Sequence, residues 1–202
     1  MGLHLHAGAR RAAAAISVIV HPFVVPIPVF ALLAFAGHGG VVREAVPEFL
    51  VASFFSTLLI VAVVALLLRF GAVASIEMDD RRDRPLPLLA GVACYLIGFL
   101  LSRLIDASTL VQALLFCYAS NTLVILFITR YWKISIHATA AAGASVALAF
   151  AFGWWAWPAA VLALLVAIAR VILGKHTTWQ VIAGICAGAI LTWIQMQFLF
   201  AA

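Results

Sequence analysis

The chain has 202 residues, of which 67% are hydrophobic and only 9% are charged. Soluble domains carry roughly 45–50% apolar and about 25% charged residues, so 12 basic and 7 acidic side chains are too few to cover a water-facing surface, and a soluble or disordered protein is excluded. Long unbroken apolar runs exclude a membrane β-barrel, whose strands alternate apolar and polar residues. We therefore expect an all-α, polytopic transmembrane helical bundle that forms one integral-membrane domain over residues 1–202.

A spanning helix needs about 20 apolar residues, and the chain is predicted to contain six to seven spans. The candidates in chain order are 13–36, 49–70, 86–105, 109–130, 137–153, 155–173 and 178–200. The break at Gly153 is either a turn between two spans or a kink within one, so the number of spans is either seven or six. Pro22, Pro26 and Pro28 are expected to break or kink the first span, and His21-Pro22 is interpreted as a helix end or packing feature.

Small and polar residues in the later spans predict how the helices pack. Gly184 and Gly188 form a small-xxx-small pair, which allows a neighbouring helix to approach closely. Ser120 and Asn121 are expected to make interhelical hydrogen bonds. The three cysteines show neither a disulfide framework nor the spacing of metal ligands.

The basic residues are distributed unequally between the two membrane faces. With seven spans, all 12 except Arg43 and Arg103 fall on the face that carries the N-terminus and the 71–85, 131–137 and 170–177 connections. Under the positive-inside rule this face is cytoplasmic, in an inner or plasma membrane.

Three polar motifs on this face each lie at or just before the start of a predicted helix. They are Glu77 to Pro85, Lys133 to His137 and Arg170 to Gln180. Free backbone N–H groups at a helix start favour an anion, and arginines add paired donors that match phosphate oxygens. Histidines can supply a nucleophile and a proton donor for phosphoryl transfer. The sequence therefore predicts a phosphate-handling site in which these motifs converge.

The motifs resemble those of the type 2 phosphatidic acid phosphatase family, which is related to vanadium haloperoxidases and acid phosphatases. Arg170, followed after five residues by His176, is similar to the family's third motif, Ser-Arg, five residues, His, three residues, Asp. Residues 134–137, Ile-Ser-Ile-His, are similar to the second motif, Pro-Ser-Gly-His, and Arg84-Pro85 to the end of the first, Lys, six residues, Arg-Pro. The resemblance implies a phosphatase-like core over residues 77–200.

The resemblance also implies roles for individual residues. His176 would be the nucleophile that forms a phosphohistidine intermediate, and His137 would protonate the leaving group. Arg84 and Arg170 would bind the phosphoryl oxygens, with further phosphate contacts from Ser135, Arg81 and Lys133. No metal or other cofactor is implied, because arginines take the place of the cation that other phosphatases use.

The chain departs from the family pattern at several positions. Glu77 stands in place of the lysine, Ile136 in place of the glycine, Ala169 in place of the serine and Gln180 in place of the aspartate that holds the nucleophilic histidine. Gln180 can accept a hydrogen bond from that imidazole, although without the charge of a carboxylate. It also completes a capping-box pattern with the threonine three residues before it, so both a catalytic-support role and a capping role are open.

The function implied is a membrane-embedded lipid phosphate phosphatase. Its substrate would be a phosphomonoester or diphosphate of a lipid, such as phosphatidate, phosphatidylglycerol phosphate or an isoprenyl phosphate, and nucleic acid is not an expected partner. One alternative is a degenerate family member that binds or transports a lipid phosphate without turnover. Another is an isoprenyl-diphosphate transferase that binds magnesium through Asp79, Asp80 and Asp83.

Overall fold

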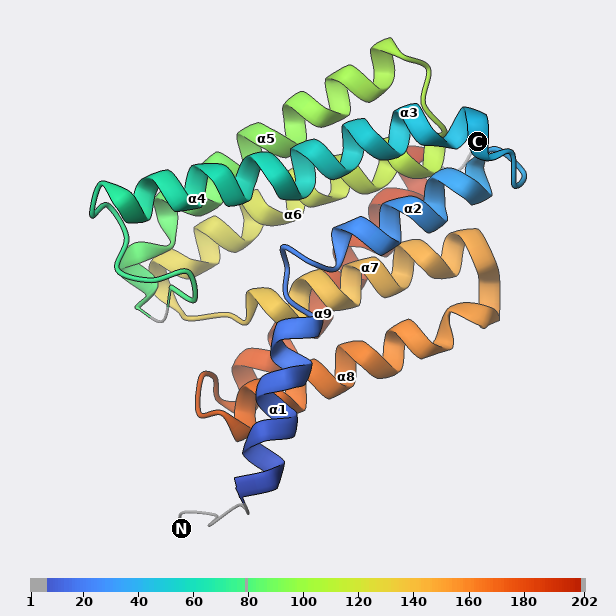
Figure 1. Cartoon of the computed structure of the whole chain (residues 1–202). Coiled ribbons are helices and arrows are strands. Elements are labelled where there is room, and N and C mark those ends of the chain that lie inside the picture. The colour runs from blue at the N-terminus through green and yellow to red at the C-terminus, as the bar shows by residue number, and fades with distance from the viewer. Residues whose placement is uncertain (1–6, 79, 201–202) are drawn as a thin grey trace.

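The computed structural model describes residues 7–78 and 80–200, and these residues form helices without a β-strand. Figure 1 shows the longer helices running side by side as a bundle. The elements in chain order are α1 (Ala7–Ile19), α2 (Pro26–Gly37), α3 (Val42–Ser53), a π-helical turn (Phe54–Leu58), α4 (Leu59–Arg69), a 3-10 turn (Arg81–Asp83), α5 (Pro85–Leu104), α6 (Thr109–Tyr131), α7 (Ile136–Phe152), a second 3-10 turn (Gly153–Ala156), α8 (Trp157–Ile172), α9 (Thr178–Gln195) and a π-helical end (Met196–Phe200). The all-α class predicted from composition is confirmed.

Five helical segments in the described part of the chain are long and apolar enough to cross a bilayer, which supports an integral membrane protein. They are Val42–Arg69, Arg81–Leu104, Thr109–Tyr131, Ile136–Ile172 and Thr178–Phe200. The fourth reverses direction at Gly153, whose φ of +59° favours glycine, and α7 and α8 pack against each other (Figure 1). This segment therefore passes through the bundle twice, and the break at Gly153 is a turn between two helices.

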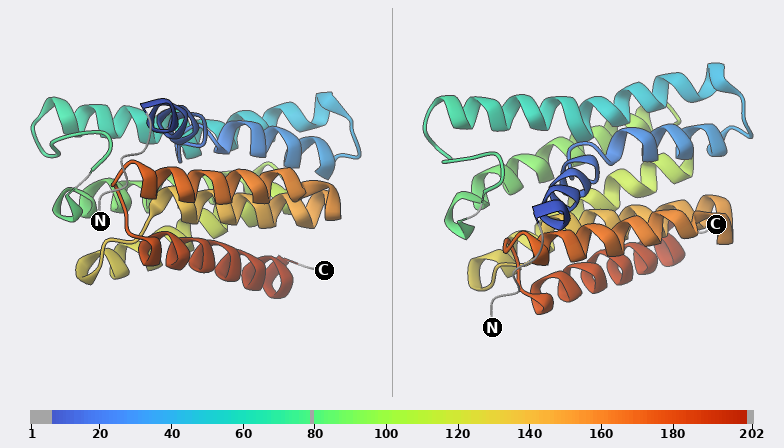
Figure 2. Two further views of the ribbon diagram at one scale, coloured as in Figure 1. Left: turned by 90° about the horizontal axis from the view of Figure 1, so that it is seen from below. Right: turned by 60° about the horizontal axis from the view of Figure 1, so that its bottom comes forward.

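The first predicted span is not one continuous helix. α1 ends at Ile19, the chain turns at His21-Pro22, and α2 begins at Pro26, as the prolines predict. In the left view of Figure 2, α1 is seen nearly end-on, whereas the other helices lie across the picture. The prediction of a span over 13–36 is therefore wrong, because a proline lacks the N–H needed to continue a helix and its ring clashes with the preceding turn.

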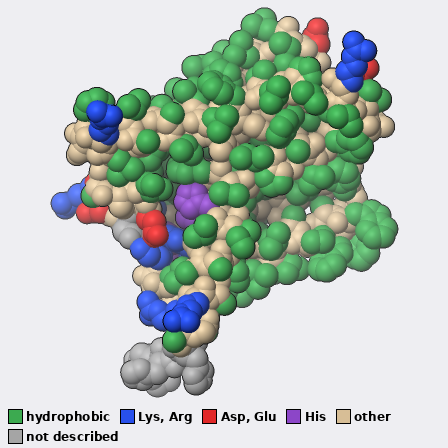
Figure 3. Space-filling model, in the orientation of Figure 1, with side chains coloured by type: hydrophobic (Ala, Val, Ile, Leu, Met, Phe, Trp, Pro, Cys, Tyr) green, Lys and Arg blue, Asp and Glu red, His purple; other side chains and the backbone are tan. Residues whose placement is uncertain are grey.

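The three connections that carry the polar motifs lie at one end of the bundle. They join α4 to α5, α6 to α7 and α8 to α9 (Figure 1). Figure 3 shows charged side chains gathered in this part of the molecule, while most of the remaining visible surface is hydrophobic. The convergence of the motifs at one membrane face follows from the antiparallel order of these helices.

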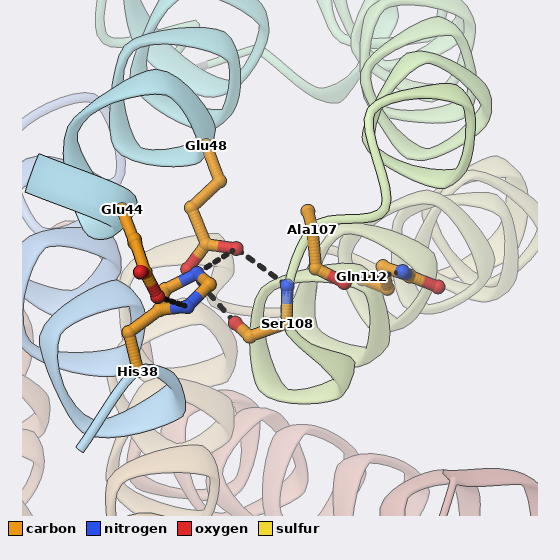
Figure 4. A network of polar contacts seen from close by, with 6 residues as sticks. All are labelled: His38, Glu44, Glu48, Ala107, Ser108 and Gln112. Atoms are coloured by element: carbon orange, nitrogen blue, oxygen red, sulfur yellow. Dashed lines mark hydrogen bonds and ion pairs between the residues drawn. The ribbon is translucent and has the colours of Figure 1, made fainter.

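The opposite end is held together by a buried carboxylate (Figure 4). Glu48 of α3 is 2% exposed and accepts hydrogen bonds from the backbone N–H and the hydroxyl of Ser108, which precedes α6. His38, after α2, lies 3.3 Å from Glu48 and 3.4 Å from Glu44. A negative charge at a helix N-terminus is stabilised by the free N–H groups there, so Glu48 fixes the start of α6 relative to α2 and α3.

Side-chain hydrogen bonds within the apolar layer link α6 to α9. Asn121 donates to Thr192 at 2.9 Å and accepts from Gln195 at 2.8 Å, and Ser120 donates to Gln195 at 2.6 Å. The interhelical bonds predicted for Ser120 and Asn121 are therefore present.

α7 and α9 share the most extensive helix contact among the described elements, and their backbones approach closely at two glycines. A Cβ on Gly184 would lie 2.7 Å from the Ser135 carbonyl oxygen, and one on Gly188 would overlap the Thr139 carbonyl group. The small-xxx-small prediction is confirmed, because no side chain fits between these backbones at either glycine.

We expect Gly188→Ala to lower the free energy of unfolding by about 1–3 kcal/mol, because the added methyl group forces α9 away from α7. The measurement is the thermal unfolding midpoint in detergent. The matched control is Gly8→Ala in α1, where an added Cβ would meet no atom within 4 Å. Equal midpoints for the two variants would contradict the close approach.

Candidate active site

A cavity of about 90 Å³ lies at the end of the bundle that carries the polar motifs. A buried water needs roughly 10–15 Å³ of such space, so the cavity has room for several waters or a group of phosphate size. Its lining combines apolar residues with titratable side chains from the α1–α2 junction, the loop before α5, α5 itself, the start of α7, the end of α8 and the α8–α9 connection. The titratable groups among them are His21, Glu77, Arg84, Tyr95, His137, Arg170 and His176.

Arg84 is positioned where the loop meets α5, which begins at Pro85. Proline is favoured at the first helical position because its missing N–H would have no partner there, and this places Arg84 at the N-cap. The side chain is only 2% exposed. Its Nε donates to the Met78 carbonyl and its Nη1 to the Ile134 carbonyl, both at 2.9 Å. These bonds fix the plane of the guanidinium and tie the first motif to the second.

Arg170 lies in the last turn of α8 and is 3% exposed. Its Nη1 donates to the Ser17 hydroxyl of α1 at 2.9 Å. Removing a guanidinium from water is costly unless hydrogen bonds or opposite charges compensate. Arg84 and Arg170 line the same cavity from different elements, so an anion placed there would interact favourably with both.

His137 stands in the first turn of α7. Ser135 is the N-cap of this helix, and its side chain accepts from the Ala138 N–H at 3.4 Å. The His137 side chain is 7% exposed, and its Nε2 has no hydrogen-bond partner among the described residues. Because buried polar atoms are generally hydrogen-bonded, this nitrogen is suited to contact a ligand in the cavity that it lines.

His176 precedes α9 and is held by Gln180. The Gln180 Oε1 lies 3.0 Å from the His176 Nδ1 and accepts from the Thr177 N–H at 3.2 Å, while the Gln180 N–H donates to the Thr177 hydroxyl at 3.4 Å. An amide oxygen only accepts, so Nδ1 carries the proton and Nε2 has a free lone pair. One oxygen of Gln180 therefore completes the capping box and also contacts the imidazole, so the capping role is present and the geometry is compatible with the catalytic-support role.

The environment of His176 keeps its imidazole neutral. The pKa of His176 is lowered to about 4, mainly by burial and also by the positive charges of Arg84, Arg170 and Lys133, while the hydrogen bond to Gln180 opposes the shift. At neutral pH the ring therefore carries no charge, as a nucleophilic nitrogen requires.

His137 and His176 belong to segments joined by a direct backbone bond. The Ser135 N–H donates to the Gln180 carbonyl at 3.2 Å. Together with the glycine contacts between α7 and α9, this bond holds the starts of the two helices next to each other.

Four of the eight predicted site residues line the cavity, namely Arg84, His137, Arg170 and His176. The other four lie outside its lining. Gln180 acts through His176, and the Ser135 hydroxyl is used to cap α7. Lys133 is near enough for its charge to affect the pKa of His176. Arg81 is exposed and donates to the Arg130 carbonyl at 2.7 Å, so in this structure it is directed away from the cavity.

His21 was not among the residues predicted for the site. It lies at a helix end, as interpreted, but its ring also lines the cavity and packs edge-on against His137 with 4.8 Å between ring centroids. The only sequence signal was a histidine before a proline within an apolar run, and this signal does not show which later segment the turn will contact.

The acidic residues of the first motif have other contacts. Asp80 accepts from the Arg82 N–H at 2.9 Å, and Asp83 accepts from the Ala74 N–H at 3.4 Å. Asp79, the third member of the magnesium hypothesis, lies outside the described residues. Glu77 pairs with Lys175 at 2.7 Å, which brings the loop before α5 to the loop before α9.

We expect NMR titration of labelled histidine in detergent to show His176 titrating near pH 4 instead of 6.5. Gln180→Glu should raise this pKa, because a carboxylate stabilises the imidazolium, and Gln180→Leu should lower it, because the accepting oxygen is lost. Between pH 6.5 and 4 the unfolded chain binds a proton here that the folded chain does not, so stability should fall as the pH decreases through this window. Titration of His176 near pH 6.5 would contradict the buried neutral state.

Comparison with known proteins agrees with this geometry. Residues 111–202 match the family model of the PAP2 superfamily, a segment that includes His137, Arg170 and His176 but not Arg84. No curated protein and no solved structure matches the chain. This match supports the resemblance drawn from the motifs: residues 111–202, just under half of the chain, are similar to the PAP2 superfamily.

Proposed function

We propose that the protein is a lipid phosphate phosphatase that hydrolyses a phosphomonoester or diphosphate of a lipid through a phosphohistidine intermediate. The observation that carries this proposal is the common cavity lined by Arg84, Arg170, His137 and His176, which come from three separate segments of the chain. Two guanidinium groups and two imidazoles supply charge stabilisation, a nucleophile and an acid–base group, which are the parts that phosphoryl transfer requires.

In the first step, the His176 Nε2 attacks phosphorus and the bond from phosphorus to the lipid oxygen breaks. Protonated His137 gives its proton to the leaving oxygen, and the negative charge of the bound phosphate favours the protonated imidazole. In the second step, a water attacks phosphorus, the P–N bond breaks and His137 takes a proton from the water. Arg84 and Arg170 bind the phosphoryl oxygens in both steps and stabilise the charge that develops on them.

An apolar groove next to the cavity supports a lipid as the substrate. It has a volume of about 500 Å³ and is lined by α2, α7 and α8, together with Ile19 and Val20, which directly precede the cavity-lining His21. A hollow between α2 and α8 is visible in Figure 3. Its lining residues on α7 run from Ala141 to Phe152, which corresponds to about 17 Å of that helix. We propose that a hydrocarbon chain of the substrate occupies it while the phosphate lies in the cavity.

The orientation of the site is part of the same proposal. Arg43 lies at the start of α3 and Arg103 at the end of α5, both at the end of the bundle away from the site. Under the positive-inside rule, the more basic end faces the cytoplasm.

We expect wild-type protein mixed with a lipid labelled with radioactive phosphate to retain acid-labile label, and His176→Ala to retain none. Phosphate release by His176→Ala should fall about 10³-fold or more, because the nucleophile is absent. Arg84→Ala should also lose most activity, since a buried phosphate donor is removed. The matched control is Arg82→Ala, an exposed arginine two residues away that does not line the cavity. Undiminished hydrolysis by purified His176→Ala would eliminate the proposal.

We expect Ala159→Trp to reduce hydrolysis of long-chain lipid phosphates while leaving hydrolysis of a short-chain, water-soluble phosphomonoester near the wild-type rate. The indole would fill part of the groove and leave the cavity intact. Ala160→Trp is the control, because Ala160 is exposed on the same helix and does not line the groove. The measurement is the ratio of kcat/KM for the two substrates, and an unchanged ratio in Ala159→Trp would exclude the groove as the chain-binding site.

Binding of a lipid phosphate without turnover is the second candidate function. It is favoured by Gln180, whose amide cannot compensate the charge of an imidazolium as a carboxylate does. Wild-type protein that binds lipid phosphate but neither retains label nor releases phosphate would establish this function. A transferase that depends on magnesium would instead be abolished by a chelator, which should leave histidine-based hydrolysis unchanged.

A further inference from the structure

A third histidine reaches the cavity from the N-terminal part of the chain, outside the segment that matches the family model. His21 follows α1, and the N–H groups of Val24 and Val25 both donate to its carbonyl, at 2.8 and 3.0 Å. This turn and the following Pro22 separate α1 from α2. The backbone around His21 is therefore well defined, and its side chain is placed on the cavity wall.

The hydrogen bonds of His21 determine which nitrogen carries the proton. Its Nδ1 accepts from the Phe23 N–H at 3.1 Å. An accepting imidazole nitrogen has no proton, so in the neutral ring the proton lies on Nε2. Burial and the charge of Arg170 lower the pKa of His21, with Glu77 opposing, and the neutral form is therefore favoured at pH 7. His21 thus has one nitrogen bound to its own turn and the other available as an N–H donor.

The surroundings of this donor are those of an anion site. His21 shares the cavity with Arg84, Arg170 and Glu77, and its ring packs against that of His137. α1 also contributes Ser17, whose hydroxyl accepts from Arg170. A neutral donor adds a hydrogen bond to a phosphate without adding a third positive charge close to the two guanidinium groups.

We propose that His21 is a phosphate-binding residue whose Nε2–H donates to a non-bridging phosphoryl oxygen of the substrate. This inference rests on the phosphate site of the proposed function. It makes the α1–α2 junction part of the active site, so that the cavity binds phosphate through segments from both the N-terminal and the C-terminal parts of the chain. His21 takes no part in bond formation or cleavage.

Two substitutions separate the two nitrogens of His21. In His21→Asn, the amide oxygen can still accept from the Phe23 N–H, but the donor at the Nε2 position is lost. In His21→Gln, the side-chain amide can place a donor near the Nε2 position, but the bond to the Phe23 N–H is lost. The first variant therefore tests the proposed ligand contact, and the second tests the contact within the turn.

The measurements are the dissociation constant of inorganic phosphate, by calorimetry in detergent, and KM and kcat for a soluble phosphomonoester. We expect His21→Asn to weaken phosphate binding about tenfold or more and to raise KM more than it lowers kcat. His21→Gln should bind phosphate more tightly than His21→Asn. Thermal unfolding midpoints show whether either variant is destabilised.

Unchanged phosphate binding in His21→Asn, or a larger loss in His21→Gln than in His21→Asn, would overturn the inference and leave His21 as a turn residue. If wild-type protein binds phosphate, His21→Asn binds it weakly, and neither hydrolyses any phosphomonoester, the inference holds while the proposed function fails. If wild-type protein hydrolyses substrate and His21→Asn retains its KM, the proposed function stands without this residue.

Discussion

The site depends on the close approach of α9 to α7. Gly184 and Gly188 bring the backbone of α9 against the carbonyl groups of Ser135 and Thr139, and the Ser135 N–H bonds to the Gln180 carbonyl. In a bilayer, lipid chains compete with helix packing for apolar side chains, so small residues that allow backbone contact and polar groups that bond across helices make association specific. His137 and His176 stand at the N-terminal ends of these segments, and their relative position follows from this contact.

The buried arginines are the second constraint. Arg84 and Arg170 are almost fully buried in a chain with few charged residues, and each is bonded to a different part of the fold. Hydrogen bonds to carbonyl and hydroxyl groups help to hold the guanidinium planes. Two guanidinium groups in the wall of one cavity would attract an anionic ligand, and their positive charges also contribute to the low pKa of His176. Burial is the larger cause of that low pKa, and the arginine charges add to it.

The N-terminal part of the chain links the polar cavity to the apolar groove. The chain changes direction at His21-Pro22, between α1 and α2. Ile19 and Val20, just before this break, line the groove, whereas His21 lines the cavity. A phosphorylated lipid has the same division between a charged group and a hydrocarbon chain. The junction between α1 and α2 is therefore placed where the two parts of such a substrate would meet.

The sequence by itself determined the helical membrane class, the order and approximate limits of most helices, the glycine contacts of α9 and the three motifs that approach one membrane face. These features are set by composition, by local periodicity and by residues close together in the chain. Only the tertiary structure decided that the run 136–172 reverses at Gly153, that Arg81 turns to the Arg130 carbonyl, and that His21 reaches the cavity. Each of these depends on contacts between segments far apart in the chain, whose distances no local pattern encodes. The sequence and the fold both contribute to the two contacts of Gln180. Its spacing from Thr177 and His176 permits either bond, and the folded geometry allows both.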